Sequence, residues 1–206
     1  MTKGQEYASG IFCWAIKKQL SSLAKFMIEE KGADINADEN TLFWAVGNDN
    51  LEMVNFLVAR GFNINAHTLT LARAVINNNL EIAKLLVENG FNINVHENTL
   101  FWAARNNNLE MAKFLLKNGF NINANNSTLH WAVFHNNFEL AKFLIKEGYN
   151  IAAEVNLFDG TVVSHNLDMA KFLIENGATS AHIQHTLRIS GILRDNKVVN
   201  FLKELL

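Results

Sequence analysis

The sequence is short of cysteine, of proline and of any excess of one charge. Its single cysteine, Cys13, excludes an internal disulfide, and this usage fits a reducing compartment. Lys and Arg number 18 against 20 Asp and Glu, so no cationic excess favours nucleic acid as a partner. No apolar run approaches the roughly 18 to 20 residues that span a bilayer, and the amino terminus lacks the apolar core of a signal peptide. We therefore expect a cytoplasmic protein without a membrane partner.

What the chain does contain is one unit copied along its length. Apolar residues make up 49% of it, enough for a sizeable core, which excludes a disordered or fibrous chain. Six glycines recur at a constant spacing of 29 residues: Gly32, Gly61, Gly90, Gly119, Gly148 and Gly177. The sequence around them recurs as well, as in GFNINAHTL at Gly61 and GFNINVHENTL at Gly90.

Two short apolar stretches follow each of these loops. The first, such as TLFWAV at Thr41 or TLHWAV at Thr128, predicts a helix of about two to three turns. The second, such as LEIAKLLVEN at Leu80, has apolar residues at i, i+2, i+3, i+5 and i+6, too many for a helix with one covered face. Because one unit cannot bury its own apolar side, the units must stack. The sequence thus predicts an all-α helix-turn-helix solenoid.

Counting the copies gives seven repeats, which we expect to form a single domain over residues 1-206. The first copy is one residue longer than the others, the sixth has drifted, and no linker divides the series. The repeats lie near 11-32, 41-61, 70-90, 99-119, 128-148, 157-177 and 186-206.

Asparagine is abundant, with 30 residues, and caps and turns explain much of that number. Asn40, Asn98, Ser127 and Asn156 come directly before the first helices and are predicted to be their N-caps. Between the two helices of a unit stand runs such as Asn77-Asn78-Asn79, where a left-handed turn is expected. The recurrent glycine should then end the second helix.

The copies resemble the ankyrin repeat, whose pattern is a T-P-L-H-x-A helix start, a second helix LEIVxxLLxxG and a linking G-A-D-V-N. STLHWA at Ser127 and GADIN at Gly32 carry the resemblance, which covers Ile11 to Leu206. The ankyrin period is 33 residues, and here it is 29. The missing residues fall where the family builds a β-hairpin finger, so the resemblance implies a solenoid with truncated hairpin loops. The motif's histidine and its hydrogen-bonding role are retained at His130.

Opposite charges repeat on the second helices at i,i+3 spacing, which indicates a solvated, self-neutralising outer face. These pairs are Glu81 and Lys84, Glu110 and Lys113, Glu139 and Lys142, and Asp168 and Lys171.

The first helices differ, because all four tryptophans occupy one repeat position. We call this position the tryptophan column: Trp14, Trp44, Arg73, Trp102, Trp131, Gly160 and Ile189. A second variable column follows one helical turn later: Lys17, Gly47, Ile76, Arg105, Phe134, Val163 and Ile192. The resemblance places the tryptophan column, the variable x of the motif, toward the concave side of the solenoid. Trp and Arg are also the side chains most enriched at binding hot spots.

We therefore predict that the first-helix face binds a partner protein. The predicted binding residues are Trp44, Arg73, Trp102, Arg105, Trp131, Phe134 and His135. Two alternatives remain: the indoles fold over the shortened loops as packing, or they form an aromatic cage for a methylated lysine. In either case Arg73 is expected to reach a neighbouring indole for a cation–π contact.

No catalytic residue, metal or cofactor is predicted. His67 and His96 are one period apart, about 10 Å in adjacent loops, too far to share an ion. Cys13 lies among apolar residues without a histidine at catalytic spacing. We expect a non-enzymatic protein-interaction module. A deep cleft lined by His130, His135 and Asp159 would favour an enzyme instead.

Two other functions within the interaction class stay open. One is an inhibitor or neutraliser of a specific protein, such as an immunity protein or a secreted effector delivered into a host cell. The other is end-to-end self-association, because terminal repeats normally turn polar on their outer side and this one does not. Its last copy keeps the apolar residues Val198, Val199, Phe201, Leu205 and Leu206.

Overall fold

The computed structural model describes residues 2–189 and 197–206. Its regular elements there are helices, and no strand occurs in this part of the chain. The chain forms two compact units, Met1–His96 and Glu97–Leu206. The single domain and its repeat boundaries stay a prediction. The stretch 190–196, which holds Ile192 and part of the predicted seventh repeat, lies outside the described residues.

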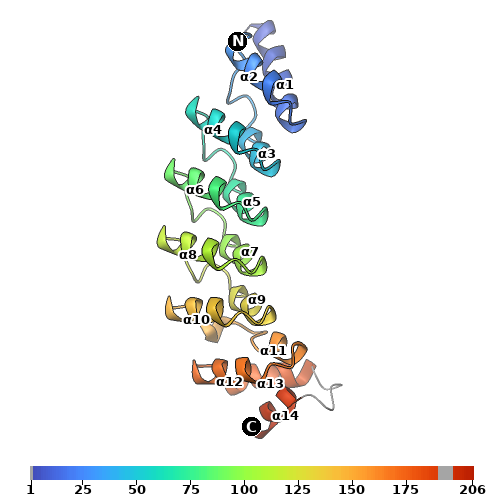
Figure 1. Cartoon of the computed structure of the whole chain (residues 1–206), viewed down its shortest axis with the longest axis vertical. Helices are drawn as coiled ribbons and strands as arrows, with labels where there is room; N and C mark the ends of the chain where they lie inside the picture. Colours follow the sequence, from blue (N-terminus) through green and yellow to red (C-terminus); the bar gives the residue numbers. More distant parts are fainter. Residues whose placement is uncertain (1, 190–196) are drawn as a thin grey trace. The chain divides into compact units, whose positions relative to one another are not determined.

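Unit 1 contains three helix pairs. The first helices α1, α3 and α5 pack in one row, and each packs against its own second helix, α2, α4 or α6 (Figure 1). The helices are α1 (Lys3–Lys17), α2 (Ser21–Glu29), α3 (Thr41–Gly47), α4 (Leu51–Ala59), α5 (Thr70–Ile76) and α6 (Leu80–Glu88).

Unit 2 continues the same pattern and varies it near its end. First helices α7, α9 and α11 pack in sequence, and α14 packs against α11, α12 and α13. A short 3-10 helix, Ile151–Ala153, precedes α11. The helices are α7 (Thr99–Arg105), α8 (Leu109–Lys117), α9 (Thr128–Phe134), α10 (Phe138–Lys146), α11 (Asp159–Val163), α12 (Leu167–Glu175), α13 (Ser180–Ile189) and α14 (Lys197–Glu204).

The core is made of the residues that repeat. In α5 and α6, for example, Leu71, Val75, Ile82 and Leu86 are almost wholly buried. The threonine that begins α3, α5, α7 and α9 is buried too, and Thr70 Oγ1 donates a hydrogen bond of 2.8 Å to the carbonyl of His67. Aliphatic burial therefore holds the helix pairs together, and the hydroxyls of Thr70 and Thr128 tie α5 and α9 to their preceding loops.

The predicted N-caps of the first helices are wrong. Asn40, Asn98 and Ser127 occupy the N-cap positions but form no side-chain cap hydrogen bond, and α11 begins three residues after Asn156. Asn40, with φ −83° and ψ −3°, lacks the extended backbone that a capping side chain normally requires.

Side-chain caps instead begin the second helices. Asn50 Oδ1 accepts a hydrogen bond of 2.9 Å from the Met53 amide at the start of α4. The same bond forms at Asn79, Asn108, Asn137 and Asn166. The third residue of these five turns, and not the residue before the first helix, therefore has the capping role, whereas α2 follows Leu20 and has no side-chain cap.

The left-handed turn residues are confirmed. The middle residue of the turn between paired helices has positive φ, as at Asp49 (58°) and Asn78 (61°), and the six recurrent glycines do as well. Asn and Asp adopt this conformation more readily than most residues because their short polar side chains bond locally.

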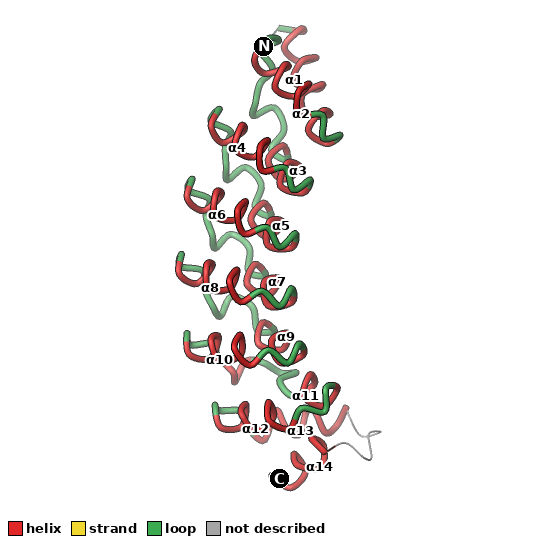
Figure 2. The backbone as a smooth tube through the Cα atoms, in the orientation of Figure 1, coloured by secondary structure: helices red, strands yellow, loops and turns green. Residues whose placement is uncertain are grey.

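The expected loss of the hairpin finger is confirmed, since the connections between repeats within the described residues contain no strand and are loops, with the 3-10 helix Ile151–Ala153 before α11 (Figure 2). Asparagine side chains join successive loops instead. In unit 1, Asn36 Oδ1 accepts from the Asn63 amide and Asn65 Oδ1 from the Asn92 amide, both at 2.8 Å. These bonds satisfy backbone donors that a hairpin would pair, which explains the abundance of asparagine.

Candidate functional site

In unit 1, the first-helix face presents exposed indoles. Trp14 is 51% exposed and Trp44 is 39% exposed. The Lys17 Nζ atom lies 5.5 Å from the centre of the Trp44 ring and 3.7 Å from the carboxylate of Asp38. This cation therefore has a carboxylate partner within its own unit.

Arg73 does not contact the predicted partner ring of unit 1. Its guanidinium carbon lies 5.9 Å from the centre of Phe43, not over the indole of Trp44. A Cβ atom at Gly47 would stand 3.3 Å from Arg73 Nε, so the missing side chain there gives the arginine its room. In the described part of the chain, the buried Nε has no hydrogen-bond partner.

In unit 2, one arginine lies between two indoles. The guanidinium carbon of Arg105 is 4.9 Å from the centre of Trp102 and 5.4 Å from the centre of Trp131. Trp102 precedes Arg105 by three residues on α7, and Trp131 comes from α9 in the next repeat. Arg105 is the last residue of α7, where a positive charge interacts favourably with the helix dipole.

Two further residues complete this group. Phe134 is 43% exposed and meets the Trp131 ring edge-to-face, with centroids 5.5 Å apart. The His135 ring lies 5.9 Å from Trp131, and its Nε2 is 2.8 Å from the Arg105 carbonyl oxygen. We call Trp102, Arg105, Trp131, Phe134 and His135 the aromatic–arginine cluster.

The structure thus brings five of the seven predicted binding residues together in unit 2, while Trp44 and Arg73 lie in unit 1. Trp102 and Trp131 are half-buried against neighbouring rings, Phe101 among them, and Arg105 is exposed. The indoles are both packed and accessible. Arg105 occupies the space between the two rings that a methylated lysine in an aromatic cage would require.

Charge is distributed differently on the two helix rows of unit 2. The sequences of α7 and α9 contain no Asp or Glu. Of the four expected i,i+3 ion pairs of the outer helices, two form, with Lys113 2.8 Å from Glu110 and Lys142 3.7 Å from Glu139. Within the described residues, no ion pair joins Glu81 to Lys84 or Asp168 to Lys171. Along α7 and α9 the first-helix face is therefore cationic and aromatic, whereas the next first helix, α11, begins with Asp159.

A buried polar network supports α9, and sequence reasoning missed it. Tyr149 Oη donates a hydrogen bond of 2.6 Å to Oε2 of Glu154, which is 1% exposed. The Tyr149 oxygen accepts from the Thr128 amide at 3.1 Å, and Glu154 accepts from the His130 amide at 3.4 Å. These two side chains cap the amino terminus of α9 from the following loop, and so they fix the helix that carries Trp131.

Burial is the main cause of the raised pKa values in this network. Desolvation raises the pKa of Glu154 to about 7, although hydrogen bonds from Tyr149 and from backbone amides oppose the rise. The pKa of Tyr149 is raised as well, by burial and by the neighbouring Glu154. The sequence signal for this network is that Tyr149 occupies the repeat position where earlier repeats have Phe62, Phe91 and Phe120.

Close helix packing leaves no room for a side chain at Gly160 in the tryptophan column. A Cβ atom on Gly160 would stand 2.6 Å from the backbone nitrogen and 2.7 Å from the Cα of Phe134. Real side chains do not tolerate such contacts, so α11 approaches the end of α9 only because residue 160 is glycine.

The residues that would have favoured an enzyme have structural contacts. His130 Nδ1 lies 3.1 Å from the Asn156 carbonyl oxygen, and Asp159 accepts a hydrogen bond from Thr186. Residues 2–189 and 197–206 hold no group of three His, Cys, Asp or Glu residues placed to bind a metal ion. The pKa of Cys13 is raised by burial, which weakens it as a nucleophile.

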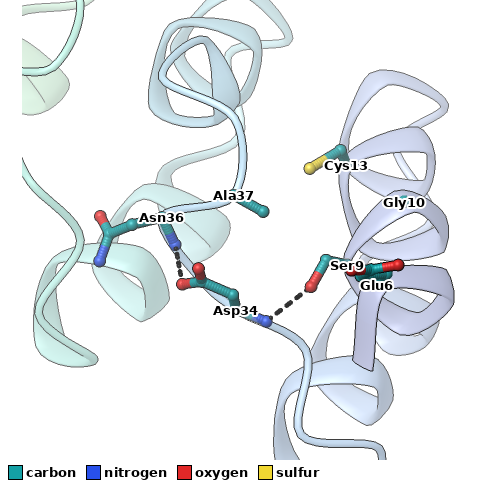
Figure 3. A pocket seen from close by; sticks show the side chains of 7 residues that line it. All are labelled: Glu6, Ser9, Gly10, Cys13, Asp34, Asn36 and Ala37. Carbon is teal, nitrogen blue, oxygen red and sulfur yellow. Dashed lines mark hydrogen bonds between the residues drawn. The ribbon is translucent and has the colours of Figure 1, made fainter. Parts of the chain in front are cut away.

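A hollow of about 450 Å³ lies beside α1 in unit 1 (Figure 3). The Asp34 amide donates to Ser9 Oγ at 2.8 Å, and the Asn36 amide donates to Asp34 Oδ1 at 2.9 Å. The polar groups that line this hollow thus connect the loop between α2 and α3 to α1.

The apolar carboxyl-terminal residues are less exposed than the self-association alternative requires. Val198 and Val199 are buried within unit 2, because α14 turns its apolar side toward α11 and α12. Leu205 and Leu206 are exposed. None of the helices in the described ranges is long and apolar enough to cross a lipid bilayer.

Paired helices, repeated buried positions and a variable first-helix face define a helical repeat protein. The family model for ankyrin repeats (3 copies) matches residues 11–97 and 71–159. The chain belongs to the ankyrin repeat family, whose repeats are generally protein–protein interaction modules. No curated protein matches the sequence.

Proposed function

We propose that the chain is a non-enzymatic module that binds another protein through its first-helix face. The aromatic–arginine cluster of unit 2 carries the proposal. It combines two indoles, an exposed phenylalanine and an arginine, the residue types that dominate binding hot spots. Membership of a family of interaction modules supports the same function. Trp44 and Arg73 extend the proposed surface within unit 1.

The cluster is suited to binding because its side chains are held before a partner arrives. Ring-to-ring contacts orient Trp131 and Phe134, and the Tyr149–Glu154 network fixes the start of α9. Less side-chain entropy is then lost on association, so more of the contact energy appears as affinity.

Site-specific photo-cross-linking in the native cell or its host tests the proposal. A photoreactive phenylalanine analogue replaces Phe134 on the first-helix face, and in the control it replaces the outer-face residue Phe138 on α10. We expect a protein adduct from position 134 and none of that mass from position 138. Identical adducts from both positions, or none from position 134, contradict the proposal.

The packing alternative is tested by Trp102→Ala. Because Trp102 is half-buried, a surface role predicts loss of the adduct at position 134 with a loss of stability smaller than that of a fully buried ring. A ring that serves only as packing predicts a loss of about 3 to 5 kcal/mol of stability instead. Chemical denaturation of the variant separates the two.

Self-association is a second candidate, and the amino-terminal helix favours it. Tyr7, Ile11 and Trp14 are exposed at i, i+4 and i+7 and form an apolar stripe on α1, against which a second copy of the chain can pack. Sedimentation at several concentrations tests it, and a monomer at every concentration removes it.

A further inference from the structure

Resting on the proposed function, we infer that the aromatic–arginine cluster binds a carboxylate of the partner protein. The carboxylate belongs to an Asp or Glu side chain next to an apolar residue. Arg105 binds the carboxylate, and Trp131 and Phe134 contact the apolar neighbour.

The first observation is that Arg105 and Lys17 occupy the same repeat position. Each cation follows a residue of the tryptophan column by three positions and lies over the indole of the next repeat, Trp131 or Trp44, at 5.4 Å and 5.5 Å. The two sites therefore share one geometry, one in each unit.

The second observation is the partner of each cation. Lys17 pairs with Asp38 at 3.7 Å, and Asp38 precedes Trp44 by six residues. The residue six positions before Trp131 is Asn125, which has no charge. In residues 2–189 and 197–206, no carboxylate lies within ion-pair distance of Arg105. In unit 1 a carboxylate fits beside the cation that lies over the indole, and in unit 2 the equivalent carboxylate is missing.

The third observation is the chemistry around Arg105. The faces of Trp102 and Trp131 hold its guanidinium without using its N–H donors in conventional hydrogen bonds, and a guanidinium can bind a carboxylate through two of them. Because α7 and α9 contain no carboxylate, an incoming acidic group meets no like charge from these helices. The exposed ring of Phe134 offers the adjacent apolar contact.

A peptide selection tests this inference. The full chain is used to select binders from a random library of 12-residue peptides displayed on phage, and each binder is titrated by fluorescence anisotropy. We expect the selected peptides to contain Asp or Glu beside an aromatic or aliphatic residue. Replacing that acid by its amide should weaken binding by about tenfold or more.

Matched variants locate the effect. Arg105→Gln should lose about tenfold in affinity for the acidic peptides, and the peptide's amide analogue should bind the wild type and this variant equally. Lys113→Gln removes the same charge from the outer face of the same repeat and should bind like the wild type. Asn125→Asp is the sharpest variant, because it supplies the internal carboxylate of unit 1 and should also weaken acidic peptides.

Asn125→Asp keeps one local hydrogen bond and removes another, because Asn125 Nδ2 donates to Asn98 Oδ1 at 2.5 Å and an aspartate has no such donor. Asn125 Oδ1 accepts from the Ser127 amide at 2.7 Å, and in unit 1 Asp38 Oδ1 accepts from the Asn40 amide at 2.9 Å. The melting curve of the variant measures the net effect on the fold. An unchanged midpoint assigns any loss of affinity to charge.

The outcomes separate the two proposals. In one outcome, Trp131→Ala weakens peptide binding, but neither the acidic residue of the peptide nor Arg105 affects it. This result overturns the carboxylate inference and leaves the proposed function standing. Peptides whose affinity is unchanged in both Trp131→Ala and Arg105→Gln bind elsewhere, and they contradict both proposals. A selection without any binder also counts against both.

Discussion

Units 1 and 2 give different side chains to equivalent repeat positions. In unit 1, Lys17 over Trp44 is neutralised by Asp38 of the next loop. In unit 2, Arg105 lies between two indoles and the equivalent of Asp38 is the neutral Asn125. The difference teaches that repeating positions maintain the fold, whereas changes at variable positions can turn an internal ion pair into a surface for a partner.

The comparison extends to two further positions. Phe62 and Phe91 of unit 1 are buried in apolar contacts, whereas their counterpart Tyr149 donates a hydrogen bond to the buried Glu154. The tryptophan column has exposed indoles in unit 1, whereas in unit 2 it contains Gly160, where the backbone of Phe134 leaves no room for a side chain.

The largest expected effect is from Gly160→Ala. Its Cβ would meet the backbone of Phe134, which cannot move as a side-chain tip can, so we expect a loss of about 3 kcal/mol in unfolding free energy. Urea denaturation measures it. Gly10→Ala in α1 is the control, because no atom lies within 4 Å of the added Cβ, and it should stabilise by about 0.5 to 1 kcal/mol. Equal effects of the two substitutions would contradict the close approach of α11 to α9.

The next effect is the pH dependence of stability that Glu154 causes. Its pKa rises from 4.5 to about 7 on folding, so between these values the folded chain binds the proton and the unfolded chain releases it. Its contribution to stability is therefore largest below pH 4.5 and falls as pH rises to about 7, by about 3 kcal/mol.

Glu154→Gln serves as the reference, because Gln does not titrate. Urea denaturation from pH 4.5 to 7.5 should show the wild type losing stability relative to this variant as pH rises. A difference that is constant with pH would mean that the pKa of Glu154 is not raised in the folded chain.

A smaller effect is expected from Tyr149→Phe. Although phenylalanine stands at this position in Phe62, Phe91 and Phe120, the variant removes the hydroxyl between Glu154 and the Thr128 amide. We expect a loss of about 1 to 3 kcal/mol in thermal or urea unfolding. The reverse change, Phe120→Tyr, places a hydroxyl where the sequence has no equivalent glutamate and should not stabilise. A neutral Tyr149→Phe would contradict the capping role of this network.

The smallest effect is from Asp38→Asn, which gives unit 1 the residue of unit 2. Hydrogen bonds from Asn40 and the charge of Lys17 lower the pKa of Asp38 against the opposing effect of its partial burial. Because Lys17 is exposed and its Nζ lies 3.7 Å from the carboxylate, loss of this ion pair should cost less than about 1 kcal/mol in urea denaturation. A loss of several kcal/mol would show that Asp38 maintains the fold.

The sequence predicted the fold well because the period and the apolar pattern depend on local residue types. It misassigned the caps because Asn suits both a cap and a turn, and only backbone angles distinguish Asn40 from Asn50. It placed Trp102, Arg105 and Trp131 on one face, but spacing alone did not reveal that Arg105 lies between both indoles. Tyr149 and Glu154 escaped prediction because their contacts with α9 arise across a loop of the drifted sixth repeat.

The most direct test of the central claim compares the two cations with one ligand. An acidic peptide selected on the full chain is titrated against Arg105→Gln and Lys17→Gln, which remove equivalent charges from unit 2 and unit 1. We predict that affinity falls by about tenfold in Arg105→Gln and is unchanged in Lys17→Gln, because Asp38 already neutralises Lys17. Equal losses in both variants, or no loss in Arg105→Gln, would contradict the account.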